Sequence, residues 1–211
     1  MKPTMAKRKE DLADLRKQQI LDAALTVFYK KGFTQSTIAD IAETAGVAVG
    51  TIYNYYKNKQ DLLVSLVTDH IAVSSVVESF SNLLEHPPGP GDTASLSPIF
   101  KERLDIGFKN VDRMAMLMGE IHRDRKLRQL FYEQVLGPIL KLLERYLESS
   151  ISNGAARPLN PALVARTMAG MFIGLTLLYK IEGKKGHLHN TSTQKLSLEI
   201  SRFVLEGIRS K

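Results

Sequence analysis

The stretch from Thr37 to Lys59, TIADIAETAGVAVGTIYNYYKNK, combines two helical patterns with a tight turn between them. Apolar residues recur at three- and four-residue steps from Ile38 to Ala45, as on the inner face of an amphipathic helix. Thr37 with Asp40 three residues later is typical of a helix start, and Gly46 is typical of a helix end. The stretch therefore predicts a helix-turn-helix unit, in which a short second helix follows the turn.

The second helix, from about Ala48 to Tyr55, has small side chains at its start. Gly50 costs about 1 kcal/mol of helix propensity relative to Ala, which indicates that something approaches the backbone closely there. In helix-turn-helix units the second helix enters the major groove of DNA, and flanking groups bind phosphates. The residues that we expect to contact DNA are Thr37, Ala48, Val49, Gly50, Thr51, Tyr53, Asn54, Tyr55 and Lys59.

Two members of the tyrosine and lysine cluster need separate treatment. Tyr56 falls on the face that packs against Phe28 and Leu63, so we expect it in the core. Lys59 stands at the start of the next helix, where its charge adds to the positive end of the helix dipole. We therefore expect Lys59 to bind a phosphate.

Composition agrees with a soluble protein that binds a polyanion. The 211 residues carry a formal net charge of +7, which favours nucleic acid or an acidic membrane surface as partner. There is no cysteine, so disulfides and thiolate chemistry are excluded. The start of the chain has no secretory signal pattern, and the apolar run from Met168 to Tyr179 is too short to span a bilayer. We expect a cytoplasmic location and no membrane partner.

The rest of the chain also has helical periodicity, and no sustained alternation predicts a strand. One helix is expected from near Lys59 toward Val77, and we expect it to link the two domains and act as the lever between them. A long helix is expected from about Lys126 to Ser150, and Asn160 is expected to cap the helix that reaches about Glu182. The fold class is therefore all-α. Breaks rich in Pro, Gly and polar residues lie near 85–98, 153–160 and 183–193. We expect an N-terminal helix-turn-helix DNA-binding domain at 14–74 and a C-terminal helical ligand-binding and dimerisation domain at 75–211.

The segment from about Asp14 to Asp69 resembles the DNA-binding domain of the TetR family of bacterial transcriptional regulators. The pattern is ILDAALTVFYKKGF, then TIADIAETAGV, then GTIYNYYKNKQDLL. Many members have polar residues where this chain has Ala48 and Val49, so base readout here is expected to depend more on Thr51, Tyr53, Asn54 and contact with thymine methyl groups. The resemblance implies a homodimer that binds a pseudo-palindromic operator in double-stranded DNA.

The C-terminal part is rich in methionine and phenylalanine at helical spacing, which is typical either of an adaptable ligand cavity or of ordinary core. The residues that we assign to a ligand cavity are Phe108, Met114, Met118, His122, Phe131, Met168, Met171, Phe172 and Tyr179. For His122 a polar pair between helices is the alternative. Such a lining favours a small hydrophobic or amphipathic effector, for instance an acyl chain or a drug-like cation.

The function we expect is a ligand-responsive homodimeric repressor, released from its operator by that effector. Dimerisation is expected through helices at 160–182 and 193–210, where Gly170 and Gly174 form a flat strip that packing within the subunit could also use. Two alternatives remain: a constitutive DNA-binding or architectural protein without an effector, and a helical enzyme. No catalytic motif supports an enzyme, and His187 and His189 lack a partner at metal-ligand spacing, so we expect no metal and no cofactor.

Overall fold

The computed structural model describes residues 5–71, 73–85 and 96–208, and every regular element in these ranges is helical. The all-α prediction is therefore confirmed. The elements are α1 (Met5–Lys31), α2 (Ile38–Ala45), α3 (Val49–Tyr53), α4 (Lys59–Ile71), α5 (Val73–Glu85), α6 (Ser97–Lys109), α7 (Val111–Arg123), α8 (Arg125–Phe131), the π-helical turn η1 (Tyr132–Leu136), α9 (Gly137–Ser152), α10 (Pro161–Glu182), the short η2 (Gly183–Lys185) and α11 (Thr193–Ile208).

The chain forms two compact units. The first comprises Met1–Val67 together with Glu120–Leu130, and the second comprises Thr68–Gly119 together with Phe131–Lys211. The ranges expected from the sequence, 14–74 and 75–211, were continuous. The structure instead places the end of α7 and most of α8 with the N-terminal helices.

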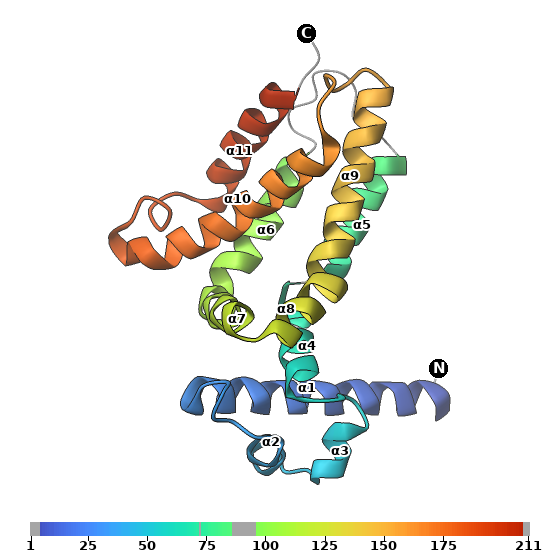
Figure 1. Ribbon diagram of the computed structural model, residues 1–211, viewed down its shortest axis with the longest axis vertical. Helices are drawn as coiled ribbons and strands as arrows, with labels where there is room; N and C mark the ends of the chain where they lie inside the picture. Colours follow the sequence, from blue (N-terminus) through green and yellow to red (C-terminus); the bar gives the residue numbers. More distant parts are fainter. Residues whose placement is uncertain (1–4, 72, 86–95, 209–211) are drawn as a thin grey trace. The chain divides into compact units, whose positions relative to one another are not determined.

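In the first unit, α2 packs against α1 and α3 follows α2 after a tight turn (Figure 1). Leu21, Phe28, Ile41 and Ile52 from these three helices are fully or almost fully buried. These are apolar positions that the helical periodicity of the sequence predicts to be buried. Tyr56 is also buried, with 6% of its surface exposed, so its assignment to the core is confirmed.

The turn between α2 and α3 has the geometry that its sequence predicts. Gly46 adopts the left-handed conformation with φ 64°, which favours glycine. Its amide donates to the carbonyl of Glu43, and the Val47 amide donates to the carbonyl of Ala42. These bonds satisfy the last carbonyls of α2 and direct the chain into α3.

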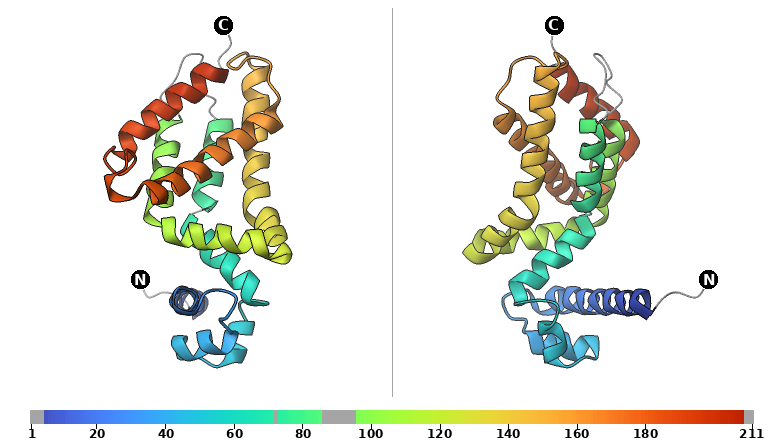
Figure 2. Two further views of the ribbon diagram at one scale, coloured as in Figure 1. Left: turned by 60° about the vertical axis from the view of Figure 1, so that its left-hand side comes forward. Right: turned by 90° about the vertical axis from the view of Figure 1, so that its right-hand side faces the viewer.

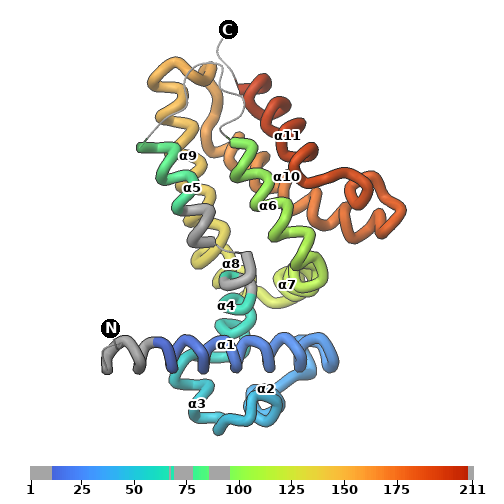
Figure 3. Tube along the Cα trace, turned by 180° about the vertical axis from the view of Figure 1, so that it is seen from behind, coloured from blue at the N-terminus to red at the C-terminus, as the bar shows by residue number. Residues whose placement is uncertain are grey.

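In the second unit, α5 packs along α9 and α6 packs along α11 (Figure 2). Helix α10 contacts both α9 and α6, and the view from behind in Figure 3 shows the same pairs side by side. The core between these helices includes Phe100, Leu143, Tyr146, Leu147 and Met168.

Two predicted helices are divided in the structure. The helix expected from Lys59 to about residue 77 is α4 followed by α5, and residue 72 between them lies outside the described residues. The helix expected at 126–150 consists of α8, η1 and α9. Pro138 explains the second division, because proline has no N–H and clashes with the carbonyl four residues earlier. The predicted break near 85–98 lies largely outside the described residues.

Candidate DNA interface and ligand cavity

The start of α3 is open to solvent. Ala48 and Gly50 are exposed, Val49 has 41% of its surface exposed, and Thr51 is half-buried. Ile52 is fully buried and anchors the helix to the core. The predicted recognition helix therefore presents its small residues outward while a single apolar side chain holds it in place.

Gly50 has no structural reason within the chain to be glycine. It lies in a helix, and a Cβ atom placed on it would meet no atom within 4 Å. An alanine there would favour the helix by up to about 1 kcal/mol. The open space at Gly50 is compatible with the prediction that an external surface, such as the wall of a DNA groove, comes close to the backbone there, and this contact stays a prediction.

The tyrosines of the cluster separate as the helical periodicity predicts. Tyr53 has 54% of its surface exposed, Asn54 is exposed and Tyr55 is half-buried. The hydroxyl of Tyr53 is thus available to a phosphate or a base beside α3. The DNA contacts of these residues stay predictions, because their exposure permits such contacts without demonstrating them.

Lys59 has a role that the sequence did not indicate. Its ammonium donates to the carbonyls of Phe33, Thr34 and Ser36 at 2.6, 3.2 and 2.8 Å, and lies 4.5 Å from the ring centre of Phe33. Because an ammonium has three N–H donors, these bonds use all of them. Burial lowers the pKa of Lys59, against the opposing effect of nearby carboxylates. Lys59 therefore anchors the loop between α1 and α2, and its effect on a phosphate would be through charge alone.

Thr37 and Asp40 form the capping box that the sequence predicts. The Asp40 amide donates to the Thr37 hydroxyl, and the Thr37 amide and hydroxyl donate to the Asp40 carboxylate. Lys31 pairs with the same carboxylate at 2.6 Å. The hydrogen bond from Lys31, followed by those from Thr37, lowers the pKa of Asp40 to about 2. Thr37 is exposed, as a phosphate contact requires, but its hydroxyl already serves the cap.

The link between α4 and α8 was not expected from the sequence. Gln60 donates to the Asp124 carboxylate at 3.0 Å, and the same carboxylate accepts from the amides of Lys126 and Leu127. The hydrogen bond from Gln60 is the main cause that lowers the pKa of Asp124. Asp124 thus caps α8 and joins it to the start of α4 within the first unit. An aspartate before an apolar helical pattern is a typical cap, so this start signal was readable.

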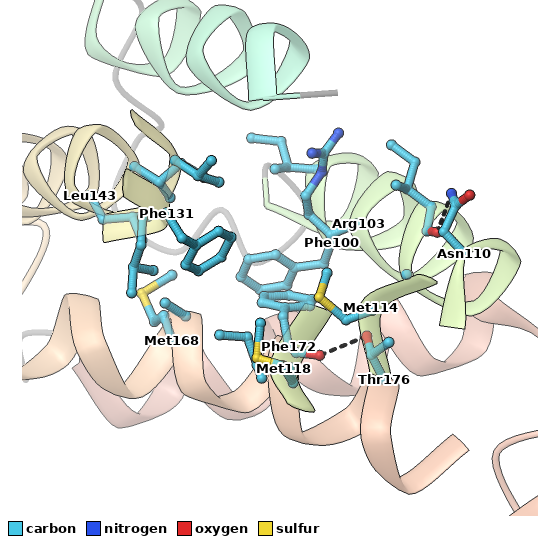
Figure 4. A pocket seen from close by; sticks show the side chains of 18 of the residues that line it. Phe100, Arg103, Asn110, Met114, Met118, Phe131, Leu143, Met168, Phe172 and Thr176 are labelled. Carbon is cyan, nitrogen blue, oxygen red and sulfur yellow. Dashed lines mark hydrogen bonds between the residues drawn. The ribbon is translucent and has the colours of Figure 1, made fainter. Parts of the chain in front are cut away.

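The second unit contains a cavity of about 140 Å³. Of the predicted ligand residues, Met114, Met118, Phe131, Met168 and Phe172 line it. Figure 4 shows the rings of Phe100, Phe131 and Phe172 and the sulfur atoms of these methionines gathered around one space. The other residues of the cavity wall were not predicted from the sequence as ligand residues; they include Ile99, Phe100, Arg103, Val135 and Ile139. Isoleucine, valine and leucine are common both in cavity walls and in solid core, so their presence in the sequence does not predict which of the two they form.

Four predicted ligand residues lie elsewhere, which corrects their assignment to this cavity. Phe108 and Tyr179 stack on each other with ring centres 3.9 Å apart, and Tyr179 stacks in turn on His189 at 3.6 Å. Met171 packs against the core cluster. His122 is exposed at the end of α7. Helical spacing places aromatic and methionine side chains on a helix face but does not reveal which neighbour that face meets.

Helices α10 and α11 leave large apolar side chains exposed. Leu163, Leu178 and Ile181 on α10 have 64%, 47% and 78% of their surface exposed, and Phe203 on α11 has 76%. The segment Pro161–Lys185 is long and apolar enough to cross a membrane by length and composition alone; the 18-residue window within it that meets this criterion has a mean hydropathy of 1.5 and 17% of its residues buried. A Cβ atom on Gly170 or Gly174 would meet nothing within 4 Å, so the described residues of the subunit do not pack against this strip.

A first unit whose short second helix is exposed and braced by the helix before it defines the class of helix-turn-helix proteins. Comparison with known proteins identifies the family within that class. Residues 20–66 match the domain described as bacterial regulatory proteins, tetR family, and residues 108–185 match the AefR-like transcriptional repressor C-terminal domain. The chain belongs to the TetR family of bacterial transcriptional regulators.

Several relatives show how far the likeness extends. The fatty acid metabolism regulator protein of Bacillus subtilis is 56% identical over 48 residues, which are 23% of this chain and 25% of that protein. The transcriptional regulator TtgR of Pseudomonas putida is 40% identical over 80 residues, 35% of this chain and 38% of its own. These two matches therefore span well under half of each curated relative.

A solved structure resembles the chain over most of its length. The transcriptional regulator FadR from Bacillus subtilis, in complex with stearoyl-CoA, superposes with a TM-score of 0.69 and 25% identity. The match covers 91% of this chain and 99% of FadR. The likeness thus includes the helical C-terminal unit as well as the head.

Proposed function

We propose that this protein is a homodimeric transcriptional repressor that binds a pseudo-palindromic DNA operator and is released by a small hydrophobic or amphipathic effector. The observation that carries the DNA-binding part is the open face of α3, where Gly50 and Tyr53 are exposed beside a buried Ile52. In this family of motifs such a face enters the major groove, and two copies read half-sites about 34 to 36 Å apart.

The cavity supports the effector part of the proposal. An apolar space of about 140 Å³ exists among Phe and Met side chains, whereas a constitutive DNA-binding protein would need only a solid core. The repressor reading is therefore favoured over the architectural one. Ligand sites usually measure about 300 to 1,000 Å³, so an effector larger than a few carbons must widen this cavity. A ligand that binds the widened form more tightly shifts the protein toward it.

Helix α7 provides a route from the cavity to the head. It carries Met114 and Met118 in the cavity wall, and its last turn, from Glu120, belongs to the first unit. Asp124 follows directly and accepts the hydrogen bond from Gln60 at the start of α4. Because a helix is stiff along its axis, displacement of the methionines is expected to reach Gln60. Helix α4, the lever expected from the sequence, would then reorient α3.

The exposed apolar side chains on α10 and α11 are the proposed dimer surface. Burial of Ile181 and Phe203 against a second copy would remove apolar area from water at about 25 cal/mol per Å². The same contact explains the high mean hydropathy of α10 without a membrane. We therefore propose a cytoplasmic protein without a membrane partner, a cofactor or a catalytic step.

The test begins with selection of an operator from random duplex DNA by the purified protein. Operator affinity is then measured by fluorescence anisotropy with and without saturating stearoyl-CoA, the ligand present in the FadR structure, and octanoate. We expect tight binding to a palindromic sequence and a loss of affinity with at least one acyl compound. Failure to select any sequence would refute the DNA-binding proposal, and unchanged affinity with both compounds would refute an acyl effector.

A further inference from the structure

The wall of the cavity is mostly apolar but has a charged residue at one edge. Among the described residues that line the cavity, Arg103 on α6 alone has a charged side chain. Its side chain is only 12% exposed. Figure 4 shows its guanidinium group to one side of the rings of Phe100 and Phe172, at the edge of the apolar lining.

The two other polar side chains in the wall are already bonded to their own helices. The Thr176 hydroxyl donates to the carbonyl of Phe172 at 2.9 Å, and the Asn110 amide donates to the carbonyl of Ile106 at 2.9 Å. Asn110 also accepts from Arg113 at 2.7 Å. The hydrogen-bonding groups of both side chains are thus used by local structure, whereas Arg103 brings a formal charge to the edge of the cavity.

Glu102, a carboxylate that pairs with Arg103, does not line the cavity. Glu102, the neighbouring residue on α6, accepts from Arg103 at 2.9 Å, and its side chain is 39% exposed. Burial lowers the pKa of Arg103 more than the Glu102 charge raises it. A guanidinium group nevertheless stays protonated in proteins, so the buried positive charge persists at every physiological pH.

We propose that Arg103 selects the charge of the effector, so that the cavity accepts amphipathic acids and rejects amphipathic cations of the same chain length. The apolar tail lies among Phe131, Met168 and Phe172, and the anionic head lies beside the Arg103 guanidinium. This inference rests on the proposed ligand-responsive function and decides between the acyl and cationic effectors that the sequence left open. A guanidinium group suits a carboxylate because its N–H groups form paired, parallel hydrogen bonds.

The volume of the cavity limits the tail that enters without rearrangement. An engineered cavity of about 150 Å³ binds benzene, and this cavity measures about 140 Å³. Short and medium chains therefore need the least widening. Octanoate, octylamine and octan-1-ol are suitable probes because they share one tail and differ in the charge of the head at neutral pH.

The experiment measures binding of these three compounds to the full-length protein by isothermal titration calorimetry at pH 7.5. The variants are Arg103→Met, which keeps an unbranched side chain without charge, and Arg103→Lys, which keeps the charge. The matched control is Lys101→Met on the same helix, because Lys101 pairs with Asp105 and does not line this cavity. Thermal unfolding followed by circular dichroism verifies that each variant is folded.

We expect the wild-type protein to bind octanoate at least about tenfold more tightly than octylamine, because like charges repel strongly in a desolvated site. Arg103→Met should bring this ratio to about one, Arg103→Lys should retain most of it, and Lys101→Met should leave it unchanged. Equal or tighter binding of octylamine by the wild type would overturn the inference. So would an unchanged ratio in Arg103→Met, because a purely structural arginine would affect all three probes alike.

The result can be separated from the proposed function as a whole. Operator binding without any effector is measured on the same preparations. Selective octanoate binding by a protein that selects no DNA sequence would support the charge assignment and refute the regulator. Operator binding combined with no preference among the probes would refute the charge assignment alone.

Discussion

At the scale of single residues, substitution of Gly50 is expected to affect the stability of the protein and its affinity for DNA in opposite directions. It occupies an exposed helical position at which a methyl group would meet no atom of another described segment within 4 Å. Most glycines in helices lower stability relative to alanine. A glycine that the free protein does not need suggests a requirement in the complex with DNA. Substitution of Gly50 therefore tests the orientation of α3 on DNA.

We predict that Gly50→Ala raises the melting temperature, because alanine stabilises α3 by up to about 1 kcal/mol. We also predict that it weakens operator binding about tenfold, because overpacking at a close contact costs about 1 to 3 kcal/mol. Circular dichroism and fluorescence anisotropy measure the two effects. Gly119→Ala is the matched control, because Gly119 is also helical, exposed and without neighbours within 4 Å. It should stabilise without affecting DNA. Unchanged operator affinity in Gly50→Ala would show that α3 does not approach DNA through this face.

The residue scale also shows what sequence alone can identify. Helical periodicity predicted that Ile52 and Tyr56 are buried and that Gly50 and Tyr53 are exposed. The three carbonyls that Lys59 binds belong to a loop more than twenty residues earlier, and no local pattern indicates such a contact. Arg103 was missed for a similar reason: an arginine in an amphipathic helix usually faces solvent.

At the scale of secondary structure elements, the start of α2 depends on the ionisation of Asp40. Its carboxylate accepts from Lys31 and Thr37, which lowers its pKa from 3.8 to about 2. A carboxyl group with a lowered pKa in the folded state stabilises the fold above its unfolded pKa and loses that effect as pH falls through the folded value.

We therefore predict that the stabilisation from Asp40 is constant from neutral pH to about pH 4 and is lost between about pH 4 and pH 2. Comparison of Asp40→Asn with the wild type isolates it from other acid effects. The difference in melting temperature should be largest at neutral pH and should shrink toward pH 2. A difference that stays the same across this range would contradict the role of the charged cap.

Boundaries of elements were predictable where capping residues mark them and not elsewhere. Thr37, Gly46 and Asn160 fix helix ends by local hydrogen bonds and by the conformational freedom of glycine, and the structure confirms each end. The division of the helix expected at 126–150 was missed because its apolar pattern continues through η1. Pro138 was the available signal, but proline is tolerated in the first turn of a helix, which is where the structure places it.

At the scale of the whole molecule, the exposed side chains of α10 and α11 form the dimer surface that we propose. Phe203 has 76% of its surface exposed, so a polar replacement should not disturb the folding of one subunit. Aromatic side chains at the centre of an interface commonly contribute about 2 kcal/mol or more to association. The sequence predicted this surface from the pattern of two long helices, and it stays a prediction, because no sequence pattern identifies which helix of a second copy would cover it.

We predict that Phe203→Glu weakens dimerisation by about thirtyfold or more, as an interface contribution of this size implies. Sedimentation velocity over a concentration series measures it, and circular dichroism verifies the helical content. Tyr29→Glu is the control, because Tyr29 is similarly exposed at 68% but lies on α1 in the first unit. Operator binding should weaken together with dimerisation. A monomeric wild-type protein, or a variant that still dimerises normally, would exclude α11 from the interface.

The π-helical turn at Tyr132–Leu136 has a further consequence for the cavity. It contains one residue more than an α-helical turn requires, and Val135 and Leu136 from it line the cavity. Conversion of this turn to regular α-helix would advance one flanking segment relative to the other by about 1.5 Å and rotate it by about 100°. Leu143, further along α9, would then leave the lining. Because Pro138 disfavours regular α-helix at this point, the extra residue of the π-helical turn is retained, and this turn fixes which side chains of α9 face the cavity.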